Sequence, residues 1–226
     1  MNPVSEFEAH VFSQSPTAAA EYDGAYFTDE WRESGHSYRV ESRRQIEGRH
    51  PELIKAVFQP ERVLDVGCGP GALMYLLHEV GVSADGLDVS PESKRLAPEA
   101  VRDRITIGAA TGSPFPDDAY DLVICRELIE HLTVLEARRL VQDVCRVSSR
   151  FVYATTRFHP NPSSMLDVTD ERHVDPTHIT VMTKDLLRVM FILEGFRSRP
   201  DLEQRMDWLN KGRVLVYEKQ RLATTA

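Results

Sequence analysis

The sequence has 226 residues, of which 42% are hydrophobic and 27% are charged, and its formal net charge is −8. This size and composition fit one globular α/β domain with room for an appendage. The dispersed Lys and Arg residues and the acidic balance disfavour a nucleic-acid partner and favour a small molecule. We find no apolar run of bilayer-spanning length, and three cysteines lack metal or disulfide spacing, so we expect a cytoplasmic protein with no membrane contact.

The first 58 residues differ in character from the rest of the chain. Residues 1–20 are polar and small, which is typical of a tail. An aromatic cluster follows, formed by Tyr22, Tyr26, Phe27 and Trp31. It is interpreted as a cap packed on the core, as a lid over a bound ligand, or as a homodimer contact. Residues 38–58 are expected to be helical, with a break near Pro51.

The stretch 62–81 combines a short apolar strand, a glycine-rich turn and a helix. Val63, Leu64 and Val66 form the near-continuous apolar run of a strand buried on both faces. The glycines of the turn lack a Cβ, so the backbone there can lie directly against a ligand: Gly67, Gly69 and Gly71. The helix that follows ends at Gly81 and directs its first N–H groups back toward the turn.

A second strand, over residues 83–89, ends in an acidic residue. Asp88 lies where open α/β sheets bind their ligands, and its carboxylate can accept hydrogen bonds from both hydroxyls of a ribose. Gly67-x-Gly69-x-x-Ala72 followed by this acid satisfies the dinucleotide fingerprint, so a nicotinamide oxidoreductase is one interpretation. Asp65, two residues before the first glycine, favours a different interpretation of this stretch.

An acid followed by Gly-x-Gly-x-Gly resembles the signature of the S-adenosylmethionine-dependent methyltransferases of the Rossmann-like (class I) superfamily. The resemblance covers roughly residues 60–220. It includes Pro114-Phe115-Pro116-Asp117 before a fourth strand, and a final pair of short segments that begin at Phe196 and at Val214.

The resemblance implies an α/β fold, with a seven-stranded, mostly parallel sheet, helices on both faces and an antiparallel final strand. We therefore expect this domain over residues 59–226, with a substrate-facing insertion at 157–182. The helix after Thr183 is expected to direct five apolar side chains inward: Leu186, Leu187, Val189, Met190 and Leu193.

The resemblance also implies S-adenosylmethionine as cofactor. The residues expected around it are Asp65, Gly67, Cys68, Gly69 and Gly71 at the methionine end, Asp88 and Val89 at the ribose, Ala109 and Ala110 at the adenine, and Arg126 at the cofactor edge. One position departs from the pattern. The family usually has an acid after the third strand, whereas this chain has Gly108-Ala109-Ala110. Adenine would then be held by backbone groups and packing, or the protein would bind the cofactor without turnover.

Two histidines are the candidate catalytic residues. His131 belongs to Glu130-His131-Leu132, which resembles a sequence that family members carry near the cofactor methyl. His178 lies in the insertion; either residue is a general base or a structural histidine. We expect methyl transfer to a small-molecule hydroxyl, that of a sugar or secondary metabolite, with no metal.

The alternative function comes from the sequence before the fifth strand. Glu127-x-x-Glu130-His131 with a distant histidine resembles the divalent-metal site of small-RNA ribose 2′-O-methyltransferases. The acidic net charge and the dispersed basic residues argue against an RNA substrate.

Overall fold

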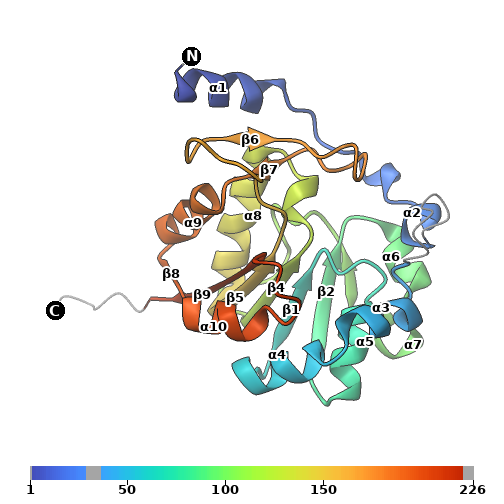
Figure 1. Cartoon of the computed structure of the whole chain (residues 1–226). Coiled ribbons are helices and arrows are strands. Elements are labelled where there is room, and N and C mark those ends of the chain that lie inside the picture. Colours follow the sequence, from blue (N-terminus) through green and yellow to red (C-terminus); the bar gives the residue numbers. More distant parts are fainter. Residues whose placement is uncertain (1, 29–36, 221–226) are drawn as a thin grey trace.

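The computed structural model describes residues 2–28 and 37–220, and a seven-stranded sheet forms its centre (Figure 1). The strands are β1 (Val63–Val66), β2 (Ala84–Asp88), β3 (Ile105–Ile107), β4 (Tyr120–Arg126), β5 (Ser148–Thr155), β8 (Phe196–Ser198) and β9 (Val214–Lys219). Their order across the sheet is β3-β2-β1-β4-β5-β9-β8. Strands β1 to β5 pair in parallel, and β9 is antiparallel to both of its neighbours. The predicted fold class is confirmed, including the insertion of the last strand into the sheet.

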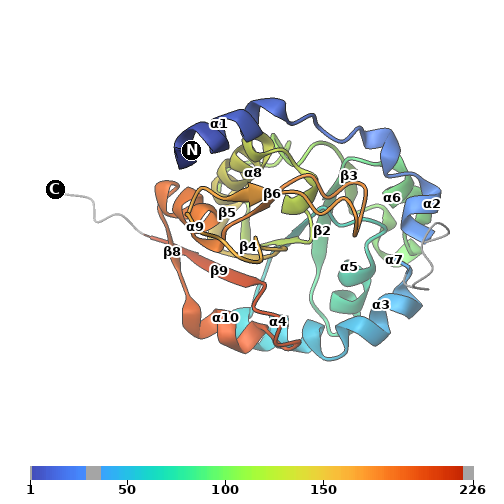
Figure 2. The same cartoon turned by 45° about the horizontal axis from the view of Figure 1, so that its top comes forward.

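Helices cover both faces of the sheet (Figures 1 and 2). One layer contains α3 (Val40–Glu47), α4 (His50–Phe58), α5 (Ala72–Glu79), α6 (Pro91–Leu96), α7 (Glu99–Arg102) and α10 (Pro200–Met206), and the other contains α8 (Val134–Val147) and α9 (Lys184–Leu193). The side chains of β4 alternate between the layers, as the two-residue period of a strand requires. Leu122 and Ile124 belong to the core under α4 and α5, whereas Val123 and Cys125 belong to the core under α8.

The buried face of α9 differs from the prediction. Leu187 and Phe191 are fully buried, but Val189 is 37% exposed and Leu193 is 77% exposed. Seven of the ten residues of α9 are apolar and they occupy more than one side of the helix, so the sequence does not reveal which of them face the core. Positions 187 and 191 are one helical turn apart, and position 193 lies about 200° around the helix from 191. Only one stripe of α9 therefore packs on the sheet.

The N-terminal residues predicted as a tail form α1 (Pro3–Ser13). Asn2 caps it by accepting a hydrogen bond from the Val4 N–H, and Pro3 suits the first helical position. The helix lies beside the insertion, whose own small sheet consists of β6 (Val168–Thr169) and β7 (Val181–Met182) (Figures 1 and 2).

Gln14 ties this N-terminal segment to the rest of the molecule. Its side-chain amide donates to the Thr180 hydroxyl at 2.6 Å, and its Oε1 accepts from the Val134 N–H at 2.8 Å. The chain then continues through η1 (Ala19–Glu21) and α2 (Gly24–Thr28) toward the glycine turn. Among the described residues, no helix is both long and apolar enough to cross a membrane.

Candidate active site

The glycine turn joins β1 to α5 at the carboxyl ends of β1, β2 and β4. Gly67 (φ +74°) and Gly69 (φ +50°) have backbone conformations that residues with a Cβ rarely adopt. A Cβ at Gly67 would lie only 3.0 Å from Leu128 Cδ2, in the loop after β4. The Gly67 N–H donates to the Leu87 carbonyl at 2.8 Å, which fixes the turn beside β2. The turn thus lies where doubly wound sheets bind their ligands.

Asp88 lies at the end of β2, next to this turn. Its Oδ2 accepts from the Gly69 N–H at 2.8 Å, and its Oδ1 accepts from the Ser90 N–H at 2.9 Å. Burial raises the pKa of the Asp88 carboxyl, and the two backbone hydrogen bonds oppose that shift. A carboxylate has about four lone-pair sites. Asp88 can therefore accept two further hydrogen bonds from a ligand.

Two adjoining cavities meet at the glycine turn. The first, of about 160 Å³, is lined by the residues predicted for ribose and adenine, namely Asp88, Val89, Ala109 and Ala110. The second, of about 430 Å³, is lined by residues predicted for the methionine end and for catalysis, namely Asp65, Cys68, Arg126, His131 and His178. Gly67 and Gly69 line both. Gly71 lines neither, because its Cα faces Val101 and Ile105 in the core.

An aromatic cap lines the first cavity on its outer side. The ring of Phe27 would be 3.4 Å from a Cβ at Gly69, and Tyr26 stacks on Tyr38 with a centroid distance of 5.6 Å. Tyr22 reaches across to His131, with 5.9 Å between ring centroids. Trp31, the fourth aromatic residue of the predicted cluster, lies outside the described residues. The described part of the cluster, Tyr22, Tyr26 and Phe27, thus borders the cavity.

A buried ionic network that the sequence did not reveal holds Arg126 at the end of β4. The guanidinium donates to Glu47 at 3.0 Å, and Glu47 also pairs with His50 Nδ1 at 2.7 Å. His50 Nε2 meets the Tyr153 hydroxyl at 2.9 Å, and the His50 ring stacks on Trp208 at 3.8 Å. Burial and the Arg126 charge together lower the pKa of His50 to about 4, although Glu47 opposes the shift. The imidazole is therefore neutral at pH 7.

Asp65 lies at the centre of the same polar region and is only 4% exposed. Burial raises its pKa to about 7, although the positive charge of Arg126 opposes the shift. A carboxylate in this position favours a cationic neighbour, such as an amino group, in the second cavity. Asp65 was singled out in the sequence because it lies two residues before Gly67.

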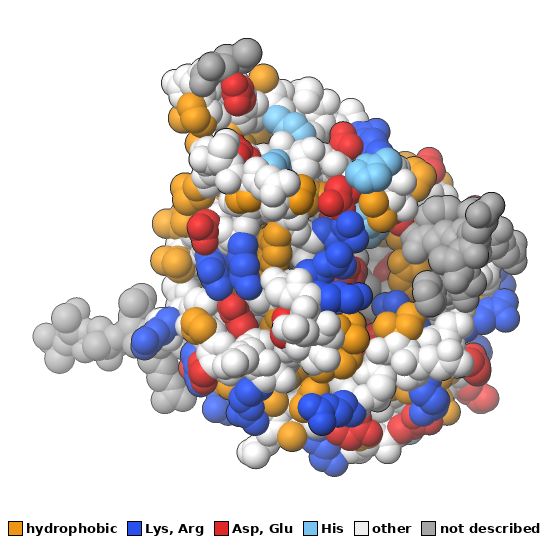
Figure 3. Space-filling model, viewed as in Figure 1, with side chains coloured by type: hydrophobic (Ala, Val, Ile, Leu, Met, Phe, Trp, Pro, Cys, Tyr) orange, Lys and Arg blue, Asp and Glu red, His pale blue; other side chains and the backbone are white. Residues whose placement is uncertain are grey.

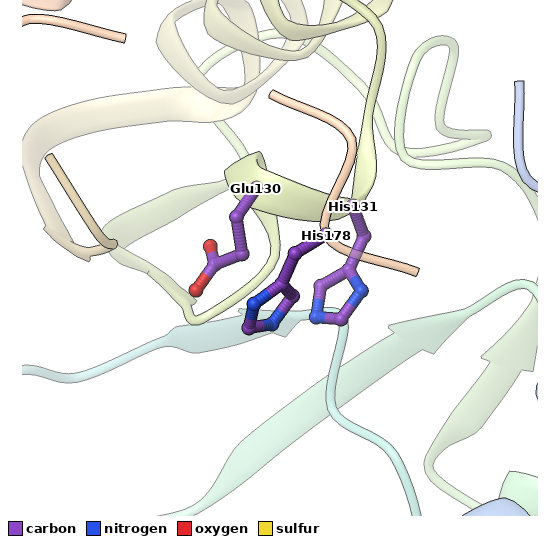
Figure 4. A group of neighbouring side chains, drawn as sticks. All are labelled: Glu130, His131 and His178. Atoms are coloured by element: carbon purple, nitrogen blue, oxygen red, sulfur yellow. The ribbon is translucent and has the colours of Figure 1, made fainter. Parts of the chain in front are cut away.

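His131 and His178 come together from distant parts of the chain (Figure 4). His131 ends η2 (Ile129–His131), just after β4, and His178 belongs to the insertion; their ring centroids are 4.8 Å apart. Burial lowers the pKa of His178, although the charge of Asp175 opposes the shift. Glu130 is fully buried beside them, and burial raises its pKa to about 8. Glu127 precedes this group with φ +48°, a strained conformation of the kind that accumulates at functional sites.

Comparison with known proteins identifies the family. The model of a methyltransferase domain family matches residues 38–199, which is most of the chain. The chain belongs to this family. A solved S-adenosylmethionine-dependent methyltransferase from Archaeoglobus fulgidus has the same fold, with a TM-score of 0.63 at 17% identity, over 87% of this chain and all of that one. The chain thus contains the methyltransferase domain that the sequence around the glycine turn predicted, in the same α/β fold as that protein.

The names of two curated relatives describe methyltransferases of small molecules. Ajmaline N-methyltransferase of Rauvolfia serpentina is 28% identical over 99 residues, which are 40% of this chain and 33% of that protein. A probable chloroplastic tocopherol O-methyltransferase of Oryza sativa subsp. japonica is 33% identical over 99 residues, 40% of this chain and 27% of that protein. The matched region thus spans about a third or less of these methyltransferases.

The cofactor that the family implies is S-adenosylmethionine, and the residues present fit it. The backbone of Gly67 and Gly69 borders both cavities, Asp88 retains acceptor capacity for two hydroxyls, and the two cavities adjoin at the turn. Gly108, Ala109 and Ala110 follow β3 without an acid, so the first cavity offers adenine a backbone and apolar border.

Proposed function

We propose that the protein transfers the methyl group of S-adenosylmethionine to a hydroxyl oxygen of a small molecule, such as a sugar or secondary metabolite. The pair formed by His131 and His178 carries this proposal, because both imidazoles line the same cavity as Gly67 and Gly69. Burial lowers the pKa of His178, so its imidazole is neutral at pH 7 and able to accept a proton. A hydroxyl needs such a base, since it becomes strongly nucleophilic only as its proton leaves.

The cofactor would occupy both cavities. Asp88 and Val89 would hold the ribose, Ala109 and Ala110 would border the adenine, and the methionine end would lie in the second cavity. There Asp65 suits the amino group and the Arg126 guanidinium suits the carboxylate by charge. S-adenosylmethionine supplies an electrophilic methyl group, and the protein would place the acceptor oxygen about 3–3.5 Å from it.

The acceptor class follows from the second cavity. Arg126, Glu130 and His178 give that cavity a polar lining, which suits a hydroxylated molecule. On the face shown in Figure 3, Lys and Arg side chains lie among Asp and Glu side chains, which together with the net charge of −8 disfavours an RNA backbone as substrate.

Location and assembly are part of the proposal. Cys68, Cys125 and Cys145 are buried free thiols, which suits the reducing cytoplasm. The aromatic cap around Phe27 would close over bound cofactor, and a homodimer contact is the alternative use of its outer side.

Calorimetric titration with S-adenosylmethionine and S-adenosylhomocysteine tests the proposal first. We expect both to bind, and labelled methyl groups then to appear on hydroxylated acceptors and not on the matched amines. Binding of both without transfer to any acceptor would favour a non-catalytic cofactor-binding protein. Absence of binding at millimolar concentration would refute the proposal altogether.

A further inference from the structure

Two buried polar atoms beside the candidate base pair have no hydrogen-bond partner among the described residues. They are Glu130 Oε1 and His178 Nδ1. Glu130 is fully buried, and His178 is 9% exposed. Buried polar atoms are nearly always paired, so two such atoms at one place call for a ligand. In the view of Figure 4, the His178 ring lies between the Glu130 carboxylate and the His131 ring.

The hydrogen bonds of His131 place its lone pair on the other ring nitrogen. The Thr177 hydroxyl donates to Asp175 Oδ1 at 2.6 Å, because an ionised carboxylate can only accept. Thr177 Oγ1 must then accept from His131 Nδ1, which lies 2.8 Å away. Nδ1 therefore carries the proton, and Nε2 carries the lone pair that a cation can use.

Of the other two side chains, Glu130 is also held by an outer hydrogen bond. Glu130 Oε2 accepts from the Thr156 hydroxyl at 2.8 Å, which leaves Oε1 as the outward atom. The negative charge of Asp175 lies near the His178 ring, with Oδ2 4.0 Å from Nε2. Metal-binding side chains are typically oriented by outer partners of this kind.

We propose that Glu130, His131 and His178 bind one divalent cation of the first transition row. One ligand atom from each of the three residues lies within 4.8 Å of the others. Two atoms that share such a cation at about 2.1 Å each are at most about 4.2 Å apart, so the widest pair needs to close by about 0.6 Å. Two imidazoles and one carboxylate favour zinc-like cations over Mg²⁺ or Ca²⁺, which prefer oxygen ligands.

The cation would lie in the second cavity, where three protein ligands leave coordination positions open. What it does there rests on the proposed function. A hydroxyl oxygen bound at an open position loses its proton more readily. The cation would therefore activate the acceptor hydroxyl in place of a histidine base. His131 and His178 would then be ligands, and their neutral state would serve coordination.

Metal titration of the full chain tests the site without any assay of activity. After treatment with EDTA, Co²⁺ is added while its visible absorption is followed, and Zn²⁺ is titrated by calorimetry. We expect one equivalent of either ion to bind. Glu130→Gln and His178→Ala should weaken binding about 100-fold or more. The control is His173→Ala, an exposed histidine of the same insertion, which should bind as the wild type does.

A milder variant keeps the test valid if a ligand substitution impairs folding. Thr156→Val removes the hydroxyl behind Glu130 and should weaken binding about tenfold, at a normal circular-dichroism spectrum. No binding at millimolar Co²⁺ and Zn²⁺, or equal affinity in Glu130→Gln and wild type, overturns the inference. Parallel titration with S-adenosylhomocysteine separates the two proposals: cofactor binding without metal binding refutes only the cation site, and metal binding without cofactor binding refutes only the proposed function.

Discussion

Replacing Asp88 should abolish tight cofactor binding while leaving the sheet intact. In the structure its two carboxylate oxygens each accept one backbone N–H, from Gly69 and from Ser90, and keep one lone-pair site each for a ribose hydroxyl. A hydrogen bond to a charged group contributes about 1.5–3 kcal/mol. Loss of two such bonds amounts to about 3–6 kcal/mol, which raises the dissociation constant by about 10²–10⁴-fold.

The assay is calorimetric titration of wild type, Asp88→Ala and Asp88→Asn with S-adenosylhomocysteine. Asp85→Asn is the matched control, because Asp85 belongs to the same strand but pairs with Arg104 at its far end, at 2.9 Å. Thermal unfolding of each variant checks that the fold survives the loss of the acceptor for the Gly69 N–H. An Asp88→Ala protein that is folded and binds within threefold of wild type would show that the ribose does not lie at β2.

Two other predictions concern the glycine turn and the buried network. Gly67→Ala should weaken S-adenosylhomocysteine binding about tenfold or more, because the new Cβ would lie 3.0 Å from Leu128 Cδ2 at a strained φ. Gly112→Ala is the control, since a Cβ at Gly112 would meet open space. Equal effects of the two substitutions on binding would contradict the reasoning. His50 should cost the wild type about 2 kcal/mol of unfolding free energy when the pH falls from 7 to 5. In the unfolded chain the imidazole gains a proton below its pKa of 6.5, whereas in the folded protein it stays neutral down to about pH 4. Urea titrations of wild type and His50→Gln at both pH values measure this, and an equal loss in both proteins would exclude His50 as its source.

The sheet was predictable because its strands have clear local signals. Val63-Leu64-Asp65-Val66 is apolar except at one functional position, and Ser90-Pro91 marks a helix start that the structure confirms through the Ser90 cap. The direction of α9 was not predictable in the same way. Val189 and Leu193 are as apolar as Leu187, so only the tertiary contacts of the helix decide which of them are buried.

Local sequence placed the candidate site residues better than it explained their partners. Asp65 is one residue from the end of β1, Asp88 ends β2 and His131 lies shortly after β4, and the carboxyl ends of parallel strands meet at one edge of the sheet. Glu47 and His50 lie on helices far upstream, and their pairing with Arg126 needs a contact across 76 or more residues. No local pattern encodes such a contact. The two residues are polar positions within otherwise ordinary helical sequence.

The site after β4 shows why one short sequence can serve two chemical interpretations. Glu127 turns the chain with a positive φ, so Glu130 and His131 enter the cavity one after the other, and the insertion supplies His178 opposite them. A neutral imidazole with a lone pair is both a proton acceptor and a metal ligand. What separates the two roles is the third group. A histidine base does not require Glu130, whereas a cation at this place would use its Oε1, which is buried and has no hydrogen-bond partner among the described residues.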